Sequence, residues 1–296
     1  MNRIALLLTA CLLLTSCTTI YEQAAYLTYK GLPLGWMVPV GEIDNGHHWE
    51  GPGAGGRFMN MDSEGMPNSS WDGKRNVLKD VDSRFLMLIG NNQGDGQYAG
   101  YSIYVNNDIA RGEVDKGKVE GRRKKHWRLK ADSIDIGICF FADQSTQWNR
   151  IDPKRQIRDL INAFDDQVCC YMIAIEPGDT SGWTPATVAD LVAYAKSLTK
   201  HPVGVHDYSS RVDYIANSGA DFACVQCWHP GDVEHHSPAD LENKLNWFRS
   251  VLPAGMDLYA FEWASLTEAR RAHIREMHKA VERSPARWSG SSTGKE

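Results

Sequence analysis

The feature that most constrains the fold is the alternation of short apolar runs with amphipathic helical patterns from residue 135 onward. Most of the apolar runs are continuous, which is typical of strands in a parallel sheet that is covered on both faces. These runs lie at 34–41, 84–90, 101–105, 135–141, 169–176, 202–207, 222–228 and 258–263. Because strands and helices in this alternation form βαβ units, the sequence predicts an α/β protein.

The segments between the apolar runs carry helix signals. Residues 153–166 place their apolar side chains on one stripe, and a Thr or Ser cap followed by proline begins helical patterns at 184 and 237. With 296 residues, of which 42% are hydrophobic, the chain can bury one large core. We therefore predict a single (β/α)8 TIM-barrel-like domain over residues 31–285, irregular or with a hairpin excursion in its first third.

Three segments do not follow the alternation. Residues 42–80 are rich in Gly, Asn and Asp without periodicity, which predicts a long loop of the kind that often forms a functional lid. Residues 111–130 are locally basic, and we predict a solvated hairpin there, with a contact to an anionic glycan or phosphate as the alternative. Residues 286–296 predict a disordered tail.

The N-terminus has the pattern of an export signal. Its apolar run at 4–14 is too short to span a bilayer as a helix. The run ends in LTSC, which resembles the lipobox of bacterial lipoproteins. The resemblance implies a signal peptide at 1–16, acylation of Cys17, a tether over 17–30 and a lipid-anchored protein of the bacterial cell envelope. Thr18 replaces the aspartate of inner-membrane retention signals, which favours the outer membrane; an ordinary secretory signal is the alternative.

Charge and motifs exclude several classes of protein. The formal net charge of -5 and the pI near 6.1 give no electrostatic footprint for nucleic-acid binding. The glycine-rich stretch at 51–56 lacks the Lys-Ser/Thr of a phosphate loop, and we predict neither a cofactor nor a metal. The cysteines after the lipobox lie in apolar runs and predict buried thiols. Cys224 and Cys227 are three apart on a predicted strand, so they point to opposite faces.

Two predicted strands end on a carboxylate. The runs CCYMIAIE and LYAFEW end on or next to Glu176 and Glu262. In a TIM barrel the functional groups lie at the carboxyl ends of the strands, and alternate residues point into the barrel. This parity places both glutamates on the face with the smaller residues, and it points His206, Gln226 and Trp228 inward as well. We predict that these side chains surround the barrel mouth.

The stretches IAIEP and YAFEW, with two strands between them, resemble the retaining glycoside hydrolases of clan A. In that superfamily of (β/α)8 barrels, the acid/base glutamate ends strand four and the nucleophilic glutamate ends strand seven. The resemblance covers residues 135–265 and implies that Glu176 is the acid/base and Glu262 the nucleophile. The sequence departs from the pattern at Ile175, where many members have Asn. If 101–105 is a barrel strand, the glutamates end strands five and eight.

The resemblance implies a poly- or oligosaccharide substrate. Indole rings stack on the C–H faces of sugars, and polar side chains at the strand ends bind hydroxyl groups. The predicted substrate-binding residues are His206, Asp207, Tyr208, Gln226, Trp228, His229, Trp183, Trp263 and Asp179.

Two other functions remain open at this point. A metal-dependent phosphodiesterase or esterase on a similar barrel needs mixed N/O ligands, for which His206, Asp207, Glu176 and His229 are the candidates. A non-catalytic envelope lipoprotein that binds a glycan or a protein is the other. In that case the two glutamates are strand-end residues that do not converge. In a retaining glycosidase, by contrast, the two carboxyl groups lie roughly 5–5.5 Å apart.

Overall fold

The structure is a computed structural model of the chain. It describes residues 28–29, 32–38, 85–89, 103–107, 111–131, 135–141, 152–179, 182–227, 237–261, 276–277, 279–281, 283–286 and 288–292. The predicted signal peptide at 1–16, the predicted lipidation site Cys17 and the predicted loop at 42–80 lie outside the described residues. Within the described residues, no helix combines the length and the apolar character that a bilayer crossing requires.

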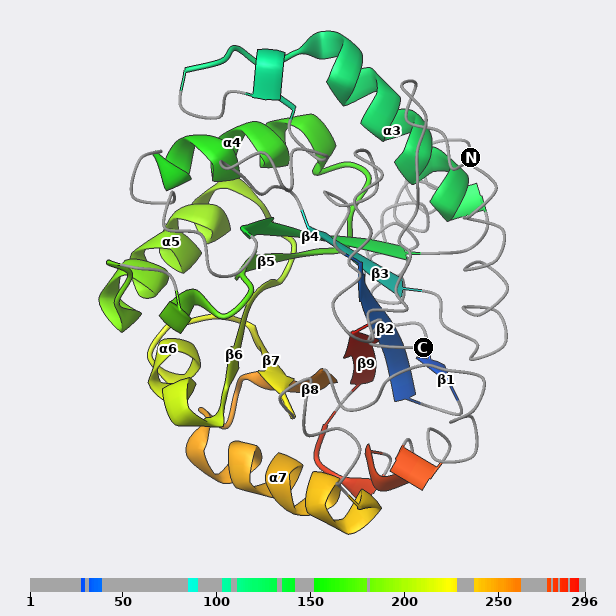
Figure 1. Cartoon of the computed structure of the whole chain (residues 1–296), viewed down its shortest axis with the longest axis vertical. Coiled ribbons are helices and arrows are strands. Elements are labelled where there is room, and N and C mark those ends of the chain that lie inside the picture. Colours follow the sequence, from blue (N-terminus) through cyan, green and yellow to red (C-terminus); the bar gives the residue numbers. More distant parts are fainter. Residues whose placement is uncertain are drawn as a thin grey trace, which may run out of the picture.

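Eight parallel strands, β2 to β9, form a barrel in sequence order (Figure 1). The barrel is closed because β9 pairs with β8 on one side and with β2 on the other. The strands are β1 (Thr28–Tyr29), β2 (Leu32–Val38), β3 (Phe85–Ile89), β4 (Asp135–Phe141), β5 (Cys170–Ala174), β6 (Val203–Tyr208), β7 (Phe222–Gln226), β8 (Asp257–Phe261) and β9 (Trp288–Ser292). The prediction of an α/β TIM barrel is confirmed. The short β1, which pairs antiparallel with β2, comes from the stretch predicted as a tether.

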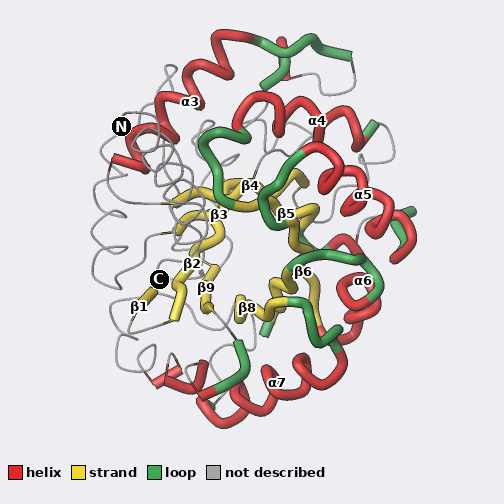
Figure 2. Tube along the Cα trace, turned by 180° about the vertical axis from the view of Figure 1, so that it is seen from behind, coloured by secondary structure: helices red, strands yellow, loops and turns green. Residues whose placement is uncertain are grey.

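Helices surround the strands on the outside of the barrel (Figure 2). They are α3 (Lys116–Ala131), α4 (Pro153–Phe164), α5 (Pro185–Leu198), α6 (Val212–Ala216) and α7 (Pro238–Val251), with 3-10 turns η2 (Val105–Asn107), η4 (Pro177–Asp179) and η5 (Ser209–Arg211). The two predicted helix starts are confirmed by their caps. The side chains of Thr184 and Ser237 each accept a hydrogen bond from the backbone N–H three residues later, at 3.2 Å.

Apolar side chains pack in two layers. The inner layer fills the barrel and contains Cys139, Cys170, Met172, Ile175, Phe222, Cys224 and Tyr259. The outer layer lies between strands and helices and includes Phe141, Tyr171, Ile173, Val205 and Cys227. Burial is confirmed for four of the cysteines, Cys139, Cys170, Cys224 and Cys227, whereas Cys169 is half-buried. Cys224 and Cys227 belong to different layers.

The facing of β8 differs from the prediction. Tyr259 belongs to the inner layer, whereas Leu258 and Ala260 belong to the outer layer. The prediction that the smaller residues of this strand point inward was therefore wrong. The physical reason is the volume available inside the barrel. Gly204 on β6 leaves room for the Phe222 ring, which packs against the ring of Tyr259 with the centroids 4.9 Å apart.

We expect Gly204→Ala to lower the free energy of unfolding by about 1–3 kcal/mol, the usual cost of overpacking a core. A Cβ atom at Gly204 would lie 2.0 Å from Cε2 of Phe222, and the ring is buried on every side. Urea denaturation measures the change. Gly255→Ala is the matched control, because a Cβ atom there meets nothing within 4 Å. Equal midpoints for the two variants would contradict the tight Gly204–Phe222 contact.

The basic segment at 111–130 is mainly a helix, so the prediction of a hairpin was wrong. Lys and Arg favour helices. Asp115 caps the start of α3, where its Oδ1 accepts hydrogen bonds from the N–H groups of Gly117 and Lys118 at 2.9 and 3.2 Å. Val119 packs against the outer layer, and the buried His126 ring meets Phe164 edge-on at 4.9 Å.

The ends of the predicted domain also need correction. Residues 288–292 form β9 rather than part of a disordered tail, because the backbone ladders to β2 and β8 require no apolar side-chain pattern. In the 101–105 run, Tyr104 makes only an isolated bridge, to Val114, and η2 follows. The barrel closes without that run. Counted from β2, β5 is therefore the fourth barrel strand and β8 the seventh.

Candidate active site

Glu176 lies two residues beyond the carboxyl end of β5, the fourth barrel strand. Its side chain is buried, with 7% of the residue exposed. Its backbone φ of 42° falls in the left-handed region, which is uncommon for a residue other than glycine. Such conformations concentrate at functional sites, where the surrounding structure holds them in place. Ile175, where many members of clan A have Asn, is buried in the inner layer.

His206 on β6 holds the backbone at Glu176. The N–H of Glu176 donates to Nδ1 of His206 at 3.4 Å, and the imidazole is fully buried. Nδ1 can accept this bond only when it carries no proton, so the neutral ring has its proton on Nε2. Burial lowers the pKa of His206 to about 3, which keeps the ring neutral at physiological pH. His206 thus fixes the conformation of the chain at the candidate acid.

Asp207 organises the turn that follows Glu176. Its buried carboxylate accepts hydrogen bonds from the N–H of Gly178 at 3.1 Å and from the N–H of Tyr208 at 2.9 Å. Arg211 of η5 is not among the site residues predicted from the sequence. Its guanidinium lies 5.1 Å from the Tyr208 ring centroid, and its side chain packs so closely on Gly178 that a Cβ atom there would collide with it. The position of Arg211 just after a strand end was the available signal.

Gln226 ends β7 and lies between Tyr208 on β6 and Phe261 on β8 in the strand register. The residue is only 2% exposed, and its Oε1 has no hydrogen-bond partner among the described residues. A buried acceptor without a partner is rare and needs an explanation, such as a bound group that donates to it. The next residue after Phe261 in the chain is Glu262.

The predicted substrate-binding residues and Glu262 fall into three groups, of which the structure places two. His206, Asp207, Tyr208 and Gln226 gather at the carboxyl ends of β6 and β7, next to the turn at Glu176. Trp183 is 6% exposed and packs edge-on against Phe141 at 5.3 Å, which is the environment of a core residue. Its predicted role as a sugar-stacking surface finds no support in this placement. Glu262, Trp228, His229, Trp263 and the side chain of Asp179 lie outside the described residues.

The described part of the chain contains no set of ligands for the metal-dependent phosphodiesterase or esterase alternative. No three His, Cys, Asp or Glu side chains in it are arranged to hold a metal ion. Both carboxylate oxygens of Asp207 bond to backbone N–H groups, and Nδ1 of His206 accepts from Glu176. These atoms serve to hold the chain around Glu176.

The low pKa of His206 predicts how stability changes with pH. An unfolded chain binds a proton at this histidine below about pH 6.5, whereas the native protein binds one only near pH 3. Between these values the free energy of unfolding should fall as pH falls, by up to about 1.4 kcal/mol per unit, and it should be fully retained above pH 6.5. Urea denaturation from pH 7 to 4 should show a shallower slope for His206→Asn, which keeps an acceptor but does not titrate. Parallel slopes for the two proteins would contradict this.

Comparisons with known proteins support the fold. No family model and no curated protein matches the sequence. Solved structures of similar fold include a GH113 β-1,4-mannanase, with a TM-score of 0.58, 8% identity and 87% of each chain covered. A β-glucosidase from Exiguobacterium marinum has a TM-score of 0.56, 10% identity and 90% coverage of both chains. A family 1 β-glucosidase from Thermotoga maritima has a TM-score of 0.54, 10% identity, and covers 90% of this chain and 89% of its own.

These neighbours are glycoside hydrolases built on TIM barrels. At about 10% identity the likeness concerns the fold: the chain has the barrel architecture on which such glycosidases are built.

Proposed function

We propose that the protein is a glycoside hydrolase that cleaves a poly- or oligosaccharide with retention of anomeric configuration. The observation that carries the proposal is the position of Glu176, which is buried and held in a left-handed conformation after the fourth barrel strand. Glu262 directly follows Phe261, the last residue of the seventh barrel strand. Strand ends four and seven are the positions that the resemblance to clan A implies for the acid/base and the nucleophile.

In the first step, Glu176 as a carboxylic acid donates its proton to the glycosidic oxygen while the bond from that oxygen to the anomeric carbon breaks. The Glu262 carboxylate bonds to the anomeric carbon and forms a glycosyl ester. In the second step, the Glu176 carboxylate removes a proton from water, the water oxygen bonds to the anomeric carbon, and Glu262 leaves as a carboxylate. Two inversions give net retention.

The other residues of the site support this chemistry. Nδ1 of His206 and the carboxylate of Asp207 accept hydrogen bonds from backbone N–H groups on either side of the turn, which fixes the path of the chain around Glu176. Oε1 of Gln226 is a buried acceptor that a sugar hydroxyl can satisfy. A fixed acid needs little reorganisation during proton transfer, which is a main source of enzymatic rate enhancement.

The test is hydrolysis of a panel of aryl glycosides and oligosaccharides, followed by NMR of the first-formed anomer. We expect turnover of at least one sugar class and a product with the anomeric configuration of the substrate. An inverted product would replace the nucleophile role of Glu262 with that of a general base. If no glycoside is bound or cleaved, the proposed hydrolase function is wrong.

We also propose that Cys17 is acylated and anchors the protein in the bacterial cell envelope, because LTSC at 14–17 resembles a lipobox. Labelled palmitate should enter the wild-type protein in growing cells but not Cys17→Ser. Incorporation into both proteins would place the lipid elsewhere.

A further inference from the structure

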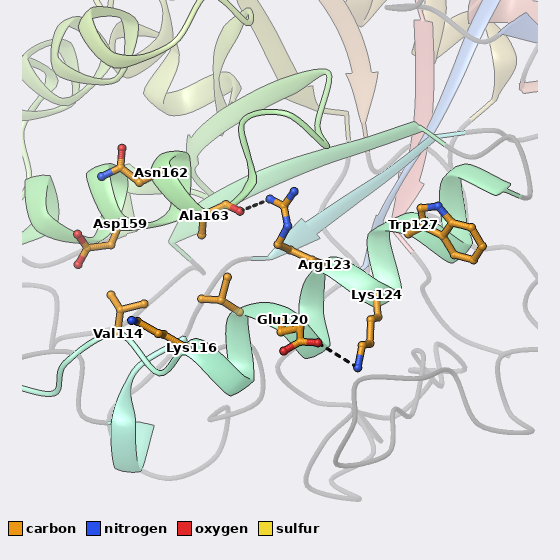
Figure 3. Close-up of a pocket in the computed structure, with 10 residues that line it drawn as sticks. Val114, Lys116, Glu120, Arg123, Lys124, Trp127, Asp159, Asn162 and Ala163 are labelled. Atoms are coloured by element: carbon orange, nitrogen blue, oxygen red, sulfur yellow. Dashed lines mark hydrogen bonds and ion pairs between the residues drawn. The ribbon is translucent and has the colours of Figure 1, made fainter.

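A groove runs along the outside of the barrel wall between α3 and α4 (Figure 3). Its volume of about 560 Å³ is within the range of roughly 300–1,000 Å³ that small-molecule sites have. The lining residues are Val114, Lys116, Val119, Glu120, Arg123, Lys124, Trp127, Asp159, Asn162 and Ala163. The groove belongs to the helical layer, whereas the candidate active site lies at the ends of β5, β6 and β7.

The groove has a stacking surface at one end. Trp127 is 68% exposed, and Figure 3 shows its indole at the opposite end of the groove from Val114 and Lys116. Lys116 and Trp127 are 11 positions apart on α3, which is about 16 Å along the helix. An exposed indole of this kind provides a flat apolar face on which a sugar ring can stack. The length of the groove suits a chain of several sugar units rather than one compact ligand.

The charge of α3 indicates what kind of sugar polymer suits the groove. The helix has eight Lys and Arg residues and one Glu, in a protein whose formal net charge is -5. Lys116 is exposed and forms no ion pair with another described residue. Lys124 pairs with Glu120 at 3.3 Å, but both side chains are more than half exposed, and such pairs contribute little and exchange readily. Both lysines are therefore available to anionic groups on a ligand.

The remaining charged groups of the groove are held by partners within the protein. Arg123 makes a two-pronged ion pair with Asp166 and also donates to the carbonyl of Ala163 at 2.8 Å, which ties α3 to α4. The Asp159 carboxylate accepts from the Tyr104 hydroxyl at 3.1 Å and lies 3.2 Å from the Arg158 guanidinium. The walls of the groove are thus fixed and largely neutralised, and the excess charge is positive.

We propose that this groove binds an acidic polysaccharide, with Trp127 stacking on a sugar ring and Lys116 and Lys124 pairing with carboxylates of the polymer. A bilayer of anionic lipids fits less well, because a flat surface cannot enter the groove between α3 and α4. The site holds a polymer against the outside of the barrel, independently of whether the barrel mouth cleaves it.

The test is affinity electrophoresis of the full chain in polygalacturonate and in its methyl ester, which share a backbone and differ in charge. We expect mobility to be retarded by the free acid and much less by the ester. Trp127→Ala should weaken binding about 10-fold, and Lys116→Glu with Lys124→Glu should weaken it at low salt and flatten its salt dependence. Trp247→Ala, 40% exposed on α7, and the exposed Lys200→Glu are the matched controls.

Three results would overturn the proposal. The first is equal retardation by the free acid and the ester. The second is retention of binding in the α3 variants. The third is binding through Trp127 and the lysines to phosphatidylglycerol vesicles but not to the polymer. Since the assay measures binding at α3, its result does not depend on whether Glu176 is a catalytic acid.

Discussion

Glu176→Gln is expected to lower kcat on an unactivated oligosaccharide by about 10²–10⁴-fold, the usual contribution of a positioned general acid. Glutamine has nearly the same shape as glutamate, so it should fit the buried site, but it cannot release a proton. An aryl glycoside whose leaving group is stable as an anion needs no proton, so its first bond cleavage should be much less affected. Glu176 also acts as the base in the second step, so the two substrates are compared by kcat/KM, which covers only the first bond cleavage and therefore isolates the acid function of Glu176.

Glu262→Gln should abolish turnover of both substrates, because no other group then attacks the anomeric carbon. Azide should restore turnover of the aryl glycoside by a Glu262→Gly variant, with a product of inverted configuration. Glu113→Gln, an exposed glutamate before α3, is the control for the substitution itself. An equal loss of kcat/KM on both substrates for Glu176→Gln, with an unchanged melting temperature, would rule out the acid role.

The second large effect is expected from removal of β9. A stop codon after residue 287 removes the strand that closes the barrel and leaves β2 and β8 with unpaired edges. Each lost backbone hydrogen bond costs roughly 0.5–1.5 kcal/mol, and the inner layer also becomes open to water. Several such losses approach the total stability of a domain, about 5–15 kcal/mol. We expect the shortened protein to lose its cooperative unfolding transition in urea.

A stop codon after Ser292 is the matched control, because it removes chain beyond β9 and keeps the whole strand. Its free energy of unfolding should stay within about 0.5 kcal/mol of that of the full chain. Both proteins should be monitored by near-ultraviolet circular dichroism, which reports aromatic packing such as that of Phe222 and Tyr259. If the protein shortened at residue 287 unfolds cooperatively with the midpoint of the full chain, the closing role of β9 is wrong.

The candidate site was only partly accessible to sequence reasoning. The alternation of side chains along a strand predicted the inward facing of His206 and Gln226 correctly, because β6 and β7 are regular and alternate without interruption. It could not give the bond from the Glu176 N–H to His206, since these residues are 30 positions apart and meet only when β5 and β6 are neighbours. The sequence does not distinguish between an indole of Trp183 that packs on Phe141 and one that faces a ligand.

The parallel α/β architecture and the helix starts at Pro185 and Pro238 follow from the sequence alone, because continuous apolar runs and capping residues act locally. The position of Glu176 after a buried strand follows from it as well. Closure of the barrel by Trp288–Ser292 is visible only in the folded protein, since backbone pairing leaves no apolar pattern. The inward facing of Tyr259 is likewise visible only there, because it depends on the space which Gly204 leaves for Phe222 on another strand.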